Sequence, residues 1–225
     1  TLFQVDTEGD VGKDSALALD AQGYAHISYY DTTRKVLKYA YQTAEGWYVQ
    51  AVDTNVDRAS DIALDSKGRP FIVYTDAALN TVKYAWNDGT SWKRGVVAES
   101  KNAVLPTVAL EGMDLPHIAY YNFFEKDLMY AHFDGTAWKI SHVDTQGDVG
   151  ADASIAVDAK GNPHIAYVDQ KLDVLKYAWF EGSAWKIVKL DTKGTVGLYT
   201  SIFLDDQQRP WVWYYEMIGN KVRYM

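Results

Sequence analysis

The chain has 225 residues, no cysteine, and a formal net charge of −8 at pH 7. The lack of cysteine excludes disulfides and thiol chemistry. The acidic balance, with no clustered basic stretch, argues against a nucleic-acid partner and against an anionic membrane surface. No run approaches the roughly 18 apolar residues of a membrane span. These properties leave glycans and other proteins as the expected partners.

One stretch, Ser154 to Tyr177 in its fourth copy, recurs five times along the chain. An acidic residue ends the first apolar segment of every copy, at intervals of 45, 46, 47 and 47 residues. Repeat periods of about 40 to 50 residues are typical of four-stranded propeller blades. The acidic residues that mark the period are Asp20, Asp65, Glu111, Asp158 and Asp205.

Each copy contains four short β-branched and aromatic runs separated by turn residues, as in the hairpin sequence Asp65 to Gly68. No segment keeps a helical period over three turns. The sequence therefore predicts an all-β fold, a five-bladed β-propeller of four-stranded antiparallel blades. The expected blades are about 15–53, 60–98, 106–144, 153–191, and 200–225 together with 1–6.

The two ends of the chain complement each other. The fifth copy stops after its third strand, and the first residues resemble the missing fourth strand, with Phe3 in the place of a tryptophan. We predict that Leu2–Val5 pairs with Lys221–Tyr224, so that the N-terminal strand completes the last blade. Such closure removes open sheet edges and makes residues 1–225 a single domain, which we expect to be a monomer.

Three columns of the repeat are interpreted as packing positions. Two are tyrosine in every copy, and a buried tyrosine covers about 150–250 Å² of surface. The third is histidine in three copies; whole blades separate these histidines, whereas ligands of one Zn²⁺ lie about 2.0 Å from it. The columns are Tyr29, Tyr74, Tyr120, Tyr167 and Tyr214; Tyr39, Tyr84, Tyr130, Tyr177 and Tyr224; and His26, His117 and His164.

A candidate ligand-binding surface lies at the ends of the second strands, where loops on a rigid scaffold gather. Acids or amides end these strands and tyrosines precede several of them, which is a combination suited to a sugar or a protein. One further acid opens an inner strand. The candidates are Asp31, Asp76, Asn122, Asp169 and Glu216, with Tyr30, Tyr121 and Tyr215, and Asp61. The alternative is a solvated polar rim.

Two loops carry acids at alternate positions, a pattern that suits calcium because Ca²⁺ takes hard oxygen ligands. The pattern departs from the EF-hand loop, since Val11 and Val149 occupy the position where that loop has glycine. The alternative is a turn in which aspartates cap backbone N–H groups. The possible calcium ligands are Asp6, Glu8, Asp10 and Asp14 in the first loop, and Asp144, Asp148 and Asp152 in the second.

Some turns resemble known propeller motifs. The segments 87–92, 133–138 and 180–185 are similar to degenerate Asp boxes of sialidase-type propellers, but they lack the leading serine and are one residue short. The segments Pro116–Asn122 and Pro163–Asp169 resemble bacterial and archaeal propeller-repeat proteins of uncharacterised role. Lectins of the tachylectin type are similar in repeat number only. These resemblances imply the fold and no catalytic residue.

The expected function is non-catalytic, lectin-like recognition of a glycan or a partner protein. A glycan-processing enzyme and a purely structural module of a larger extracellular protein are the alternatives. Glycoside hydrolases need two carboxylates roughly 5–10 Å apart, and the acids that end the second strands should be roughly 14 Å apart from blade to blade. The abundance of tyrosine and tryptophan suggests a secreted or cell-surface protein.

Overall fold

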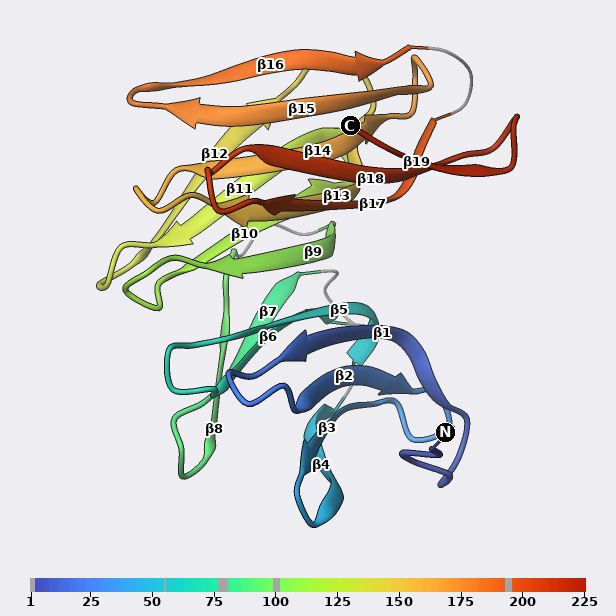
Figure 1. Ribbon diagram of the computed structural model, residues 1–225, viewed down its shortest axis with the longest axis vertical. Coiled ribbons are helices and arrows are strands. Elements are labelled where there is room, and N and C mark those ends of the chain that lie inside the picture. The colour runs from blue at the N-terminus through green and yellow to red at the C-terminus, as the bar shows by residue number, and fades with distance from the viewer. Residues whose placement is uncertain (1–2, 55, 77–80, 99–101, 193–195) are drawn as a thin grey trace. The chain divides into compact units, whose positions relative to one another are not determined.

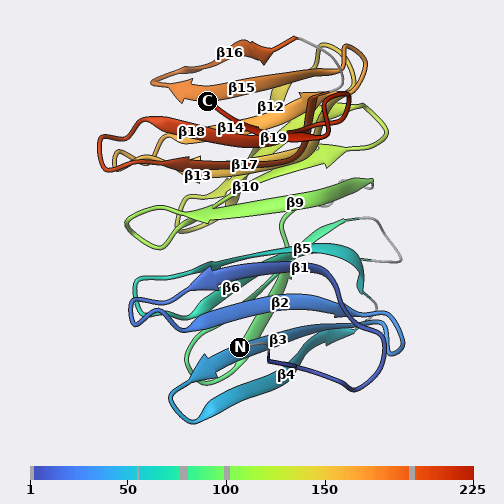
Figure 2. The same cartoon turned by 45° about the vertical axis from the view of Figure 1, so that its right-hand side comes forward.

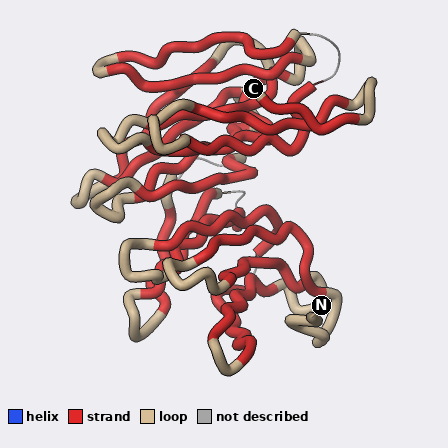
Figure 3. The backbone as a smooth tube through the Cα atoms, in the orientation of Figure 1, coloured by secondary structure: helices blue, strands red, loops and turns tan. Residues whose placement is uncertain are grey.

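The computed structural model describes residues 3–54, 56–76, 81–98, 102–192 and 196–225. These residues form strands and turns (Figures 1 and 3). No helix long and apolar enough to cross a membrane occurs among them. The strands belong to five antiparallel sheets, each a meander in which neighbouring strands follow one another along the chain.

The first sheet contains β1 (Val11–Leu19), β2 (Ala25–Asp31), β3 (Val36–Thr43) and β4 (Gly46–Thr54). The second contains β5 (Val56–Leu64), β6 (Pro70–Asp76), β7 (Val82–Asn87) and β8 (Trp92–Val96). The third contains β9 (Ala103–Leu110), β10 (Pro116–Asn122), β11 (Asp127–Phe133) and β12 (Trp138–Asp144). The fourth contains β13 (Val149–Val157), β14 (Pro163–Asp169), β15 (Val174–Glu181) and β16 (Ala184–Asp191). The fifth contains β17 (Val196–Leu204), β18 (Pro210–Glu216) and β19 (Lys221–Tyr224).

Five successive meanders of this kind are the blades of a β-propeller, so the predicted all-β, five-bladed fold class is confirmed, with three strands in the last blade. The chain forms two compact units, Thr1–Pro106 and Thr107–Met225. Within the second unit, β13 lies beside β17 (Figure 2). In the first, β1 lies beside β5.

The predicted pairing of the two chain ends stays a prediction, and so does the single domain over residues 1–225. Leu2 lies outside the described residues, and residues 3–7 belong to no strand. The fifth sheet accordingly ends on β19, where Val222 and Tyr224 are 69% and 61% exposed.

The innermost strand of each sheet begins three or four residues earlier than predicted. The reason is a repeated irregularity: the pairing register of β1, β13 and β17 shifts near its start. Non-glycine residues there adopt positive φ, 50° at Asp14, 53° at Leu105, 47° at Asp152 and 53° at Tyr199. A β-bulge accommodates such residues, so segments that resemble loops in sequence continue the strands.

The core follows the predicted columns. Tyr74, Tyr120 and Tyr167 are fully buried, and isoleucines and alanines of neighbouring strands pack with Tyr74 and Tyr167 in two clusters. Burial of this kind supplies most of the stabilisation, at about 25 cal/mol for each Å² of apolar surface removed from water. The interpretation of this tyrosine column as packing is confirmed.

In four repeats, the hydroxyl group of the tyrosine in this column hydrogen-bonds to an acid of the preceding repeat. Tyr74 donates to Asp53 at 2.6 Å, and Lys83 donates to the same carboxylate oxygen at 2.7 Å. We call this arrangement, an acid from the end of one repeat held by a tyrosine and a cation of the next, the latch. The other latches are Asp6 with Tyr29 and Lys38, Asp144 with Tyr167 and Lys176, and Asp191 with Tyr214 and Arg223.

Candidate functional site

The four acids that end second strands and were predicted to bind a ligand lie against the cations of these latches. Asp31 and Asp169 have no exposed surface. The ammonium of Lys38 is 3.3 Å from Asp31, and that of Lys176 is 2.8 Å from Asp169. Burial raises the pKa of Asp31, but hydrogen bonds from Arg34 and Lys38 outweigh it and hold this pKa below its usual value. Both carboxylates are thus occupied within the protein.

The rest of this column lies similarly. Glu216 is buried and receives a 2.6 Å hydrogen bond from Arg223, and Asp76 lies 3.7 Å from Lys83. Asn122 closes its own turn by accepting from the backbone of Phe124. Such contacts stabilise strand ends and turns. A ligand-binding role for the column stays a prediction.

The remaining predicted ligand residues are dispersed. Tyr121 donates to Asp148 at 2.6 Å, and Tyr215 donates to Asn220. Tyr30 is buried in the first core cluster. Asp61 lies in β5, and its carboxylate accepts from the backbone N–H of Ile62 at 2.9 Å. Each of these side chains thus has its own local packing or hydrogen-bond contact.

Five of the seven possible calcium ligands have separate partners. Asp6 and Asp144 belong to latches, Asp10 accepts from Thr32 at 2.6 Å, and Glu8 pairs with Arg34 at 3.4 Å. Lys126 donates to Asp148 at 2.7 Å, whereas Asp14 and Asp152 lie within strands β1 and β13. Within the described ranges, no three of these seven acids place ligand atoms within 4.8 Å of one another. Calcium binding stays a prediction.

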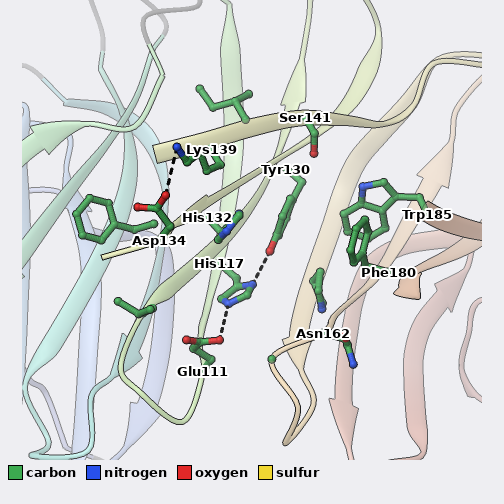
Figure 4. A pocket seen from close by; sticks show the side chains of 15 residues that line it. Glu111, His117, Tyr130, His132, Asp134, Lys139, Ser141, Asn162, Phe180 and Trp185 are labelled. Atoms are coloured by element: carbon green, nitrogen blue, oxygen red, sulfur yellow. Dashed lines mark hydrogen bonds and ion pairs between the residues drawn. The ribbon is translucent and has the colours of Figure 1, made fainter. Parts of the chain in front are cut away.

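A pocket of about 480 Å³ opens at the opposite end of the strands, within the second unit (Figure 4). The third sheet supplies one wall, and the turn between β13 and β14 with the ends of β15 and β16 supplies the other. Phe133, Phe180 and Trp185 are half-buried there, and each presents ring surface to the pocket. The edge of Trp185 meets Tyr130 at a centroid distance of 5.2 Å.

A chain of polar groups stands behind this aromatic surface. His117 Nδ1 is 2.5 Å from the hydroxyl of Tyr130, and its Nε2 is 3.4 Å from Glu111 (Figure 4). Burial lowers the pKa of His117, against the opposing effect of Glu111. A neutral imidazole that accepts from Tyr130 and donates to Glu111 fits this arrangement. The first and fourth sheets repeat it with Asp20, His26 and Tyr39, and with Asp158, His164 and Tyr177.

The rim of the pocket carries an ion pair. Asp134 lies in the turn that resembles a degenerate Asp box, and its ammonium partner Lys139 is 3.2 Å away. Hydrogen bonds from the hydroxyl and N–H of Thr136 and from the N–H of Ala137 hold the pKa of Asp134 well below its usual value. The rim therefore offers a fixed negative charge and a cation that is more than half exposed.

Sequence reasoning placed the candidate site at the other end of the strands. The signal for this pocket was present in the histidine column and in the tryptophans that open the fourth strands, since both belong to the same end of each sheet. What the sequence could not show is that Trp185 of one blade covers Tyr130 of the blade before it.

No protein-family model and no curated protein sequence matches the chain. Solved structures do match. A protein of unknown function from Dyadobacter fermentans superimposes with a TM-score of 0.69 at 12% identity, covering 94% of this chain and 74% of that one. Such a likeness at low identity shows the fold alone.

Two further matches have functional descriptions. The Aleuria aurantia lectin AAL, as a mutant in complex with Fucα1-6GlcNAc, gives a TM-score of 0.60 at 12% identity, covering 94% of this chain and 77% of its own. An α-L-arabinofuranosidase from Lactobacillus brevis gives 0.56 at 10% identity, covering 90% and 82%. The chain thus has the propeller fold that both a lectin and a glycoside hydrolase use.

Proposed function

We propose that this protein is a non-catalytic glycan-binding module whose binding site is the pocket between the third and fourth blades. The observation that carries the proposal is the combination of three half-buried aromatic rings, Phe133, Phe180 and Trp185, with polar groups at the rim, Asp134 and Lys139. Aromatic faces cover the C–H surface of a sugar ring, and a few placed polar groups select its hydroxyls.

The likeness to a lectin supports glycan recognition, and the likeness to an arabinofuranosidase keeps hydrolysis as the alternative. Hydrolysis needs one carboxyl group that donates a proton to the leaving sugar. Asp134 does not suit that role, because three hydrogen bonds and Lys139 hold its carboxylate ionised, and the other acid of the pocket, Glu111, is paired with His117 at 3.4 Å. Binding without cleavage is therefore the better-supported function.

A protein partner is the second candidate. The turn between β10 and β11 exposes Phe123 and Phe124 to 65% and 81%, and the turn between β18 and β19 exposes Ile218 to 75%. Exposed apolar groups of this size often mark interaction surfaces. A secreted or cell-surface location, expected from the composition, would bring either kind of partner within reach.

The test is a glycan array probed with the whole chain, once with calcium and once with a chelator, followed by calorimetry on any glycan bound. We expect Trp185→Ala to weaken binding at least about tenfold, or 1.4 kcal/mol. Trp92→Ala is the matched control, because Trp92 makes the same edge contact with Tyr39, at 5.4 Å, outside this pocket.

Binding that survives Trp185→Ala unchanged would place the glycan elsewhere and refute the proposed site. If no glycan on the array is bound, with calcium or with the chelator, glycan binding is refuted and the protein partner is favoured. Release of sugar from the bound glycan, followed over hours, would favour the enzyme.

A further inference from the structure

A second cluster of polar side chains lies at the other end of the third sheet, where β10 turns into β11. Glu125 lies in that turn, Asp127 opens β11, and His142 lies on the adjacent strand β12. Each offers one ligand atom, and the three atoms lie within 4.8 Å of one another. His142 Nδ1 is 3.0 Å from the Asp127 carboxylate. Donor atoms bound to one ion at about 2.0–2.2 Å have this mutual spacing.

The repeat shows that this cluster is specific to one blade. The first blade has Arg34, Val36 and Ala51 at the three equivalent positions. The fourth has Leu172, Val174 and Lys189. The fold is formed equally well by those residues, so folding does not require two carboxylates and an imidazole here.

The charges of the cluster are not balanced within the protein. Asp127 is only 7% exposed, and the ion pairs of the described residues give neither Asp127 nor Glu125 a lysine or arginine. In the fourth blade, Lys176 lies between two acids, but Met129 occupies the equivalent position of the third. Two neighbouring carboxylates repel each other, and a cation bound between them offsets this repulsion.

A hydrogen bond from a neighbouring residue holds one ligand of the cluster in position. The amide of Asn122 donates to Glu125 at 2.8 Å and so fixes one carboxylate oxygen. Hydrogen bonds from residues outside the ligand set orient the ligands at metal sites in this way. The side chain of His142 is about half exposed, which leaves a path for an ion and room for water ligands.

From this geometry we infer that Glu125, Asp127 and His142 bind one divalent ion of the zinc class. Calcium takes oxygen ligands only, whereas an imidazole nitrogen with two carboxylates suits Zn²⁺ and neighbouring first-row ions. Three protein ligands leave at least one position for water. This site is separate from the proposed glycan pocket, and either can fail without the other.

The probe is ZnCl₂, titrated into the whole, tag-free chain after chelator treatment, in competition with a chromogenic chelator. We expect one equivalent to bind with a Kd in about the micromolar range or tighter. Asp127→Asn and His142→Ala should each raise this Kd at least about tenfold. His132→Gln, which removes an imidazole from the same sheet outside the cluster, should leave it unchanged.

Asp127 is buried, so its variant could fail to fold. Glu125→Gln changes an exposed side chain and therefore gives a second measurement of the effect on zinc affinity. Circular dichroism checks that each variant is folded. Weaker zinc binding in Glu125→Gln and His142→Ala with native spectra supports the site. The absence of stoichiometric zinc binding by the unmodified chain would overturn it, as would equal affinity in these variants.

Discussion

The phenol of Tyr167 donates a 2.8 Å hydrogen bond to Asp144, a residue that closes the preceding repeat. The ammonium of Lys176 donates to the same oxygen at 3.0 Å and also lies 2.8 Å from Asp169. One buried cation thus compensates two buried acids. The charged groups depend on one another, because removing one of them leaves a buried charge without its partner.

We predict that Lys176→Met destabilises the protein by about 3–5 kcal/mol, because it removes the cationic partner of buried carboxylates. The chain already contains an uncharged version of this arrangement: Met129 and Asn122 of the third repeat occupy the positions of Lys176 and Asp169, and Ala98 at the end of the second repeat occupies that of Asp144. The triple variant Lys176→Met, Asp169→Asn and Asp144→Ala should therefore recover much of the loss. Urea unfolding measures both; a triple variant less stable than the single one would contradict the argument.

Stability should fall as the pH drops below about 6.5, the ordinary pKa of histidine. Burial lowers the pKa of His26 and of His164 in the folded state, against the opposing effect of a nearby aspartate. The unfolded chain therefore takes up protons first, and unfolding is favoured as pH falls through this range.

The second blade supplies the control for this pH effect, because Phe71 occupies the histidine position and stacks on Tyr84 at 5.4 Å. The double variant His26→Phe and His164→Phe should show a smaller change in the free energy of unfolding between pH 7 and pH 5. The quantity compared is the slope of the free energy of unfolding against pH. An unchanged slope in the double variant would show that these histidines do not cause the loss of stability.

A further loss is expected below about pH 4, where carboxyl groups of the unfolded chain become protonated. Burial raises the pKa of Asp53, but hydrogen bonds from Lys83 and Tyr74 hold it below its ordinary value. Its stabilising contribution is thus present above the unfolded pKa and disappears as pH falls through the folded one. Asp53→Asn should reduce the pH dependence in this acid range, measured by thermal unfolding from pH 5 to pH 2.

Two glycines at equivalent positions should respond differently to alanine. Gly12 has φ +95°, and a Cβ there meets nothing within 4 Å. Gly150 has φ +107°, and a Cβ would lie 2.8 Å from the backbone Cα of Leu128. We expect backbone strain of about 1–3 kcal/mol in both, and a further cost of about 1–3 kcal/mol from overpacking in Gly150→Ala alone. Equal losses would contradict the close contact.

Deletion of residues 1–5 tests the predicted closure while it keeps Asp6, the acid of the first latch. If the N-terminal strand completes the last blade, the deletion leaves β19 as an open edge, which invites association between molecules. We expect a lower Tm and concentration-dependent aggregation. A shortened chain with the original Tm that remains monomeric would show that the first five residues do not close the fold.

The fold could be predicted because its signal is repeated. Five copies of each tyrosine and each turn acid average out local ambiguity, and hairpin turns such as Asp65 to Gly68 form as expected, with the N–H of Gly68 donating to Asp65 at 2.8 Å. The bulges that begin the inner strands were missed because positive φ at residues such as Asp152 follows from tertiary pairing and has no glycine to signal it.

The candidate sites were harder to predict because they depend on departures from the repeat and on contacts between copies. An acid at the end of a second strand looks available in sequence, but whether Asp169 is free depends on Lys176 reaching it from the next strand. The pocket depends on Trp185 reaching across to another blade. His142 and Asp127 are 15 positions apart in the sequence, and the pairing of β12 with β11, in which His142 faces Met129, brings them to 3.0 Å.

The latches also define which segments can be exchanged between proteins of this kind. Each acid is encoded at the end of one repeat, and the tyrosine and cation that hold it are encoded in the next. A graft that cuts between repeats would separate the members of a latch and leave a buried charge without its partner, whereas a cut in the hairpin between the third and fourth strands of a blade would keep them together. Chimaeras built from this chain should therefore be joined within the hairpins that connect third and fourth strands.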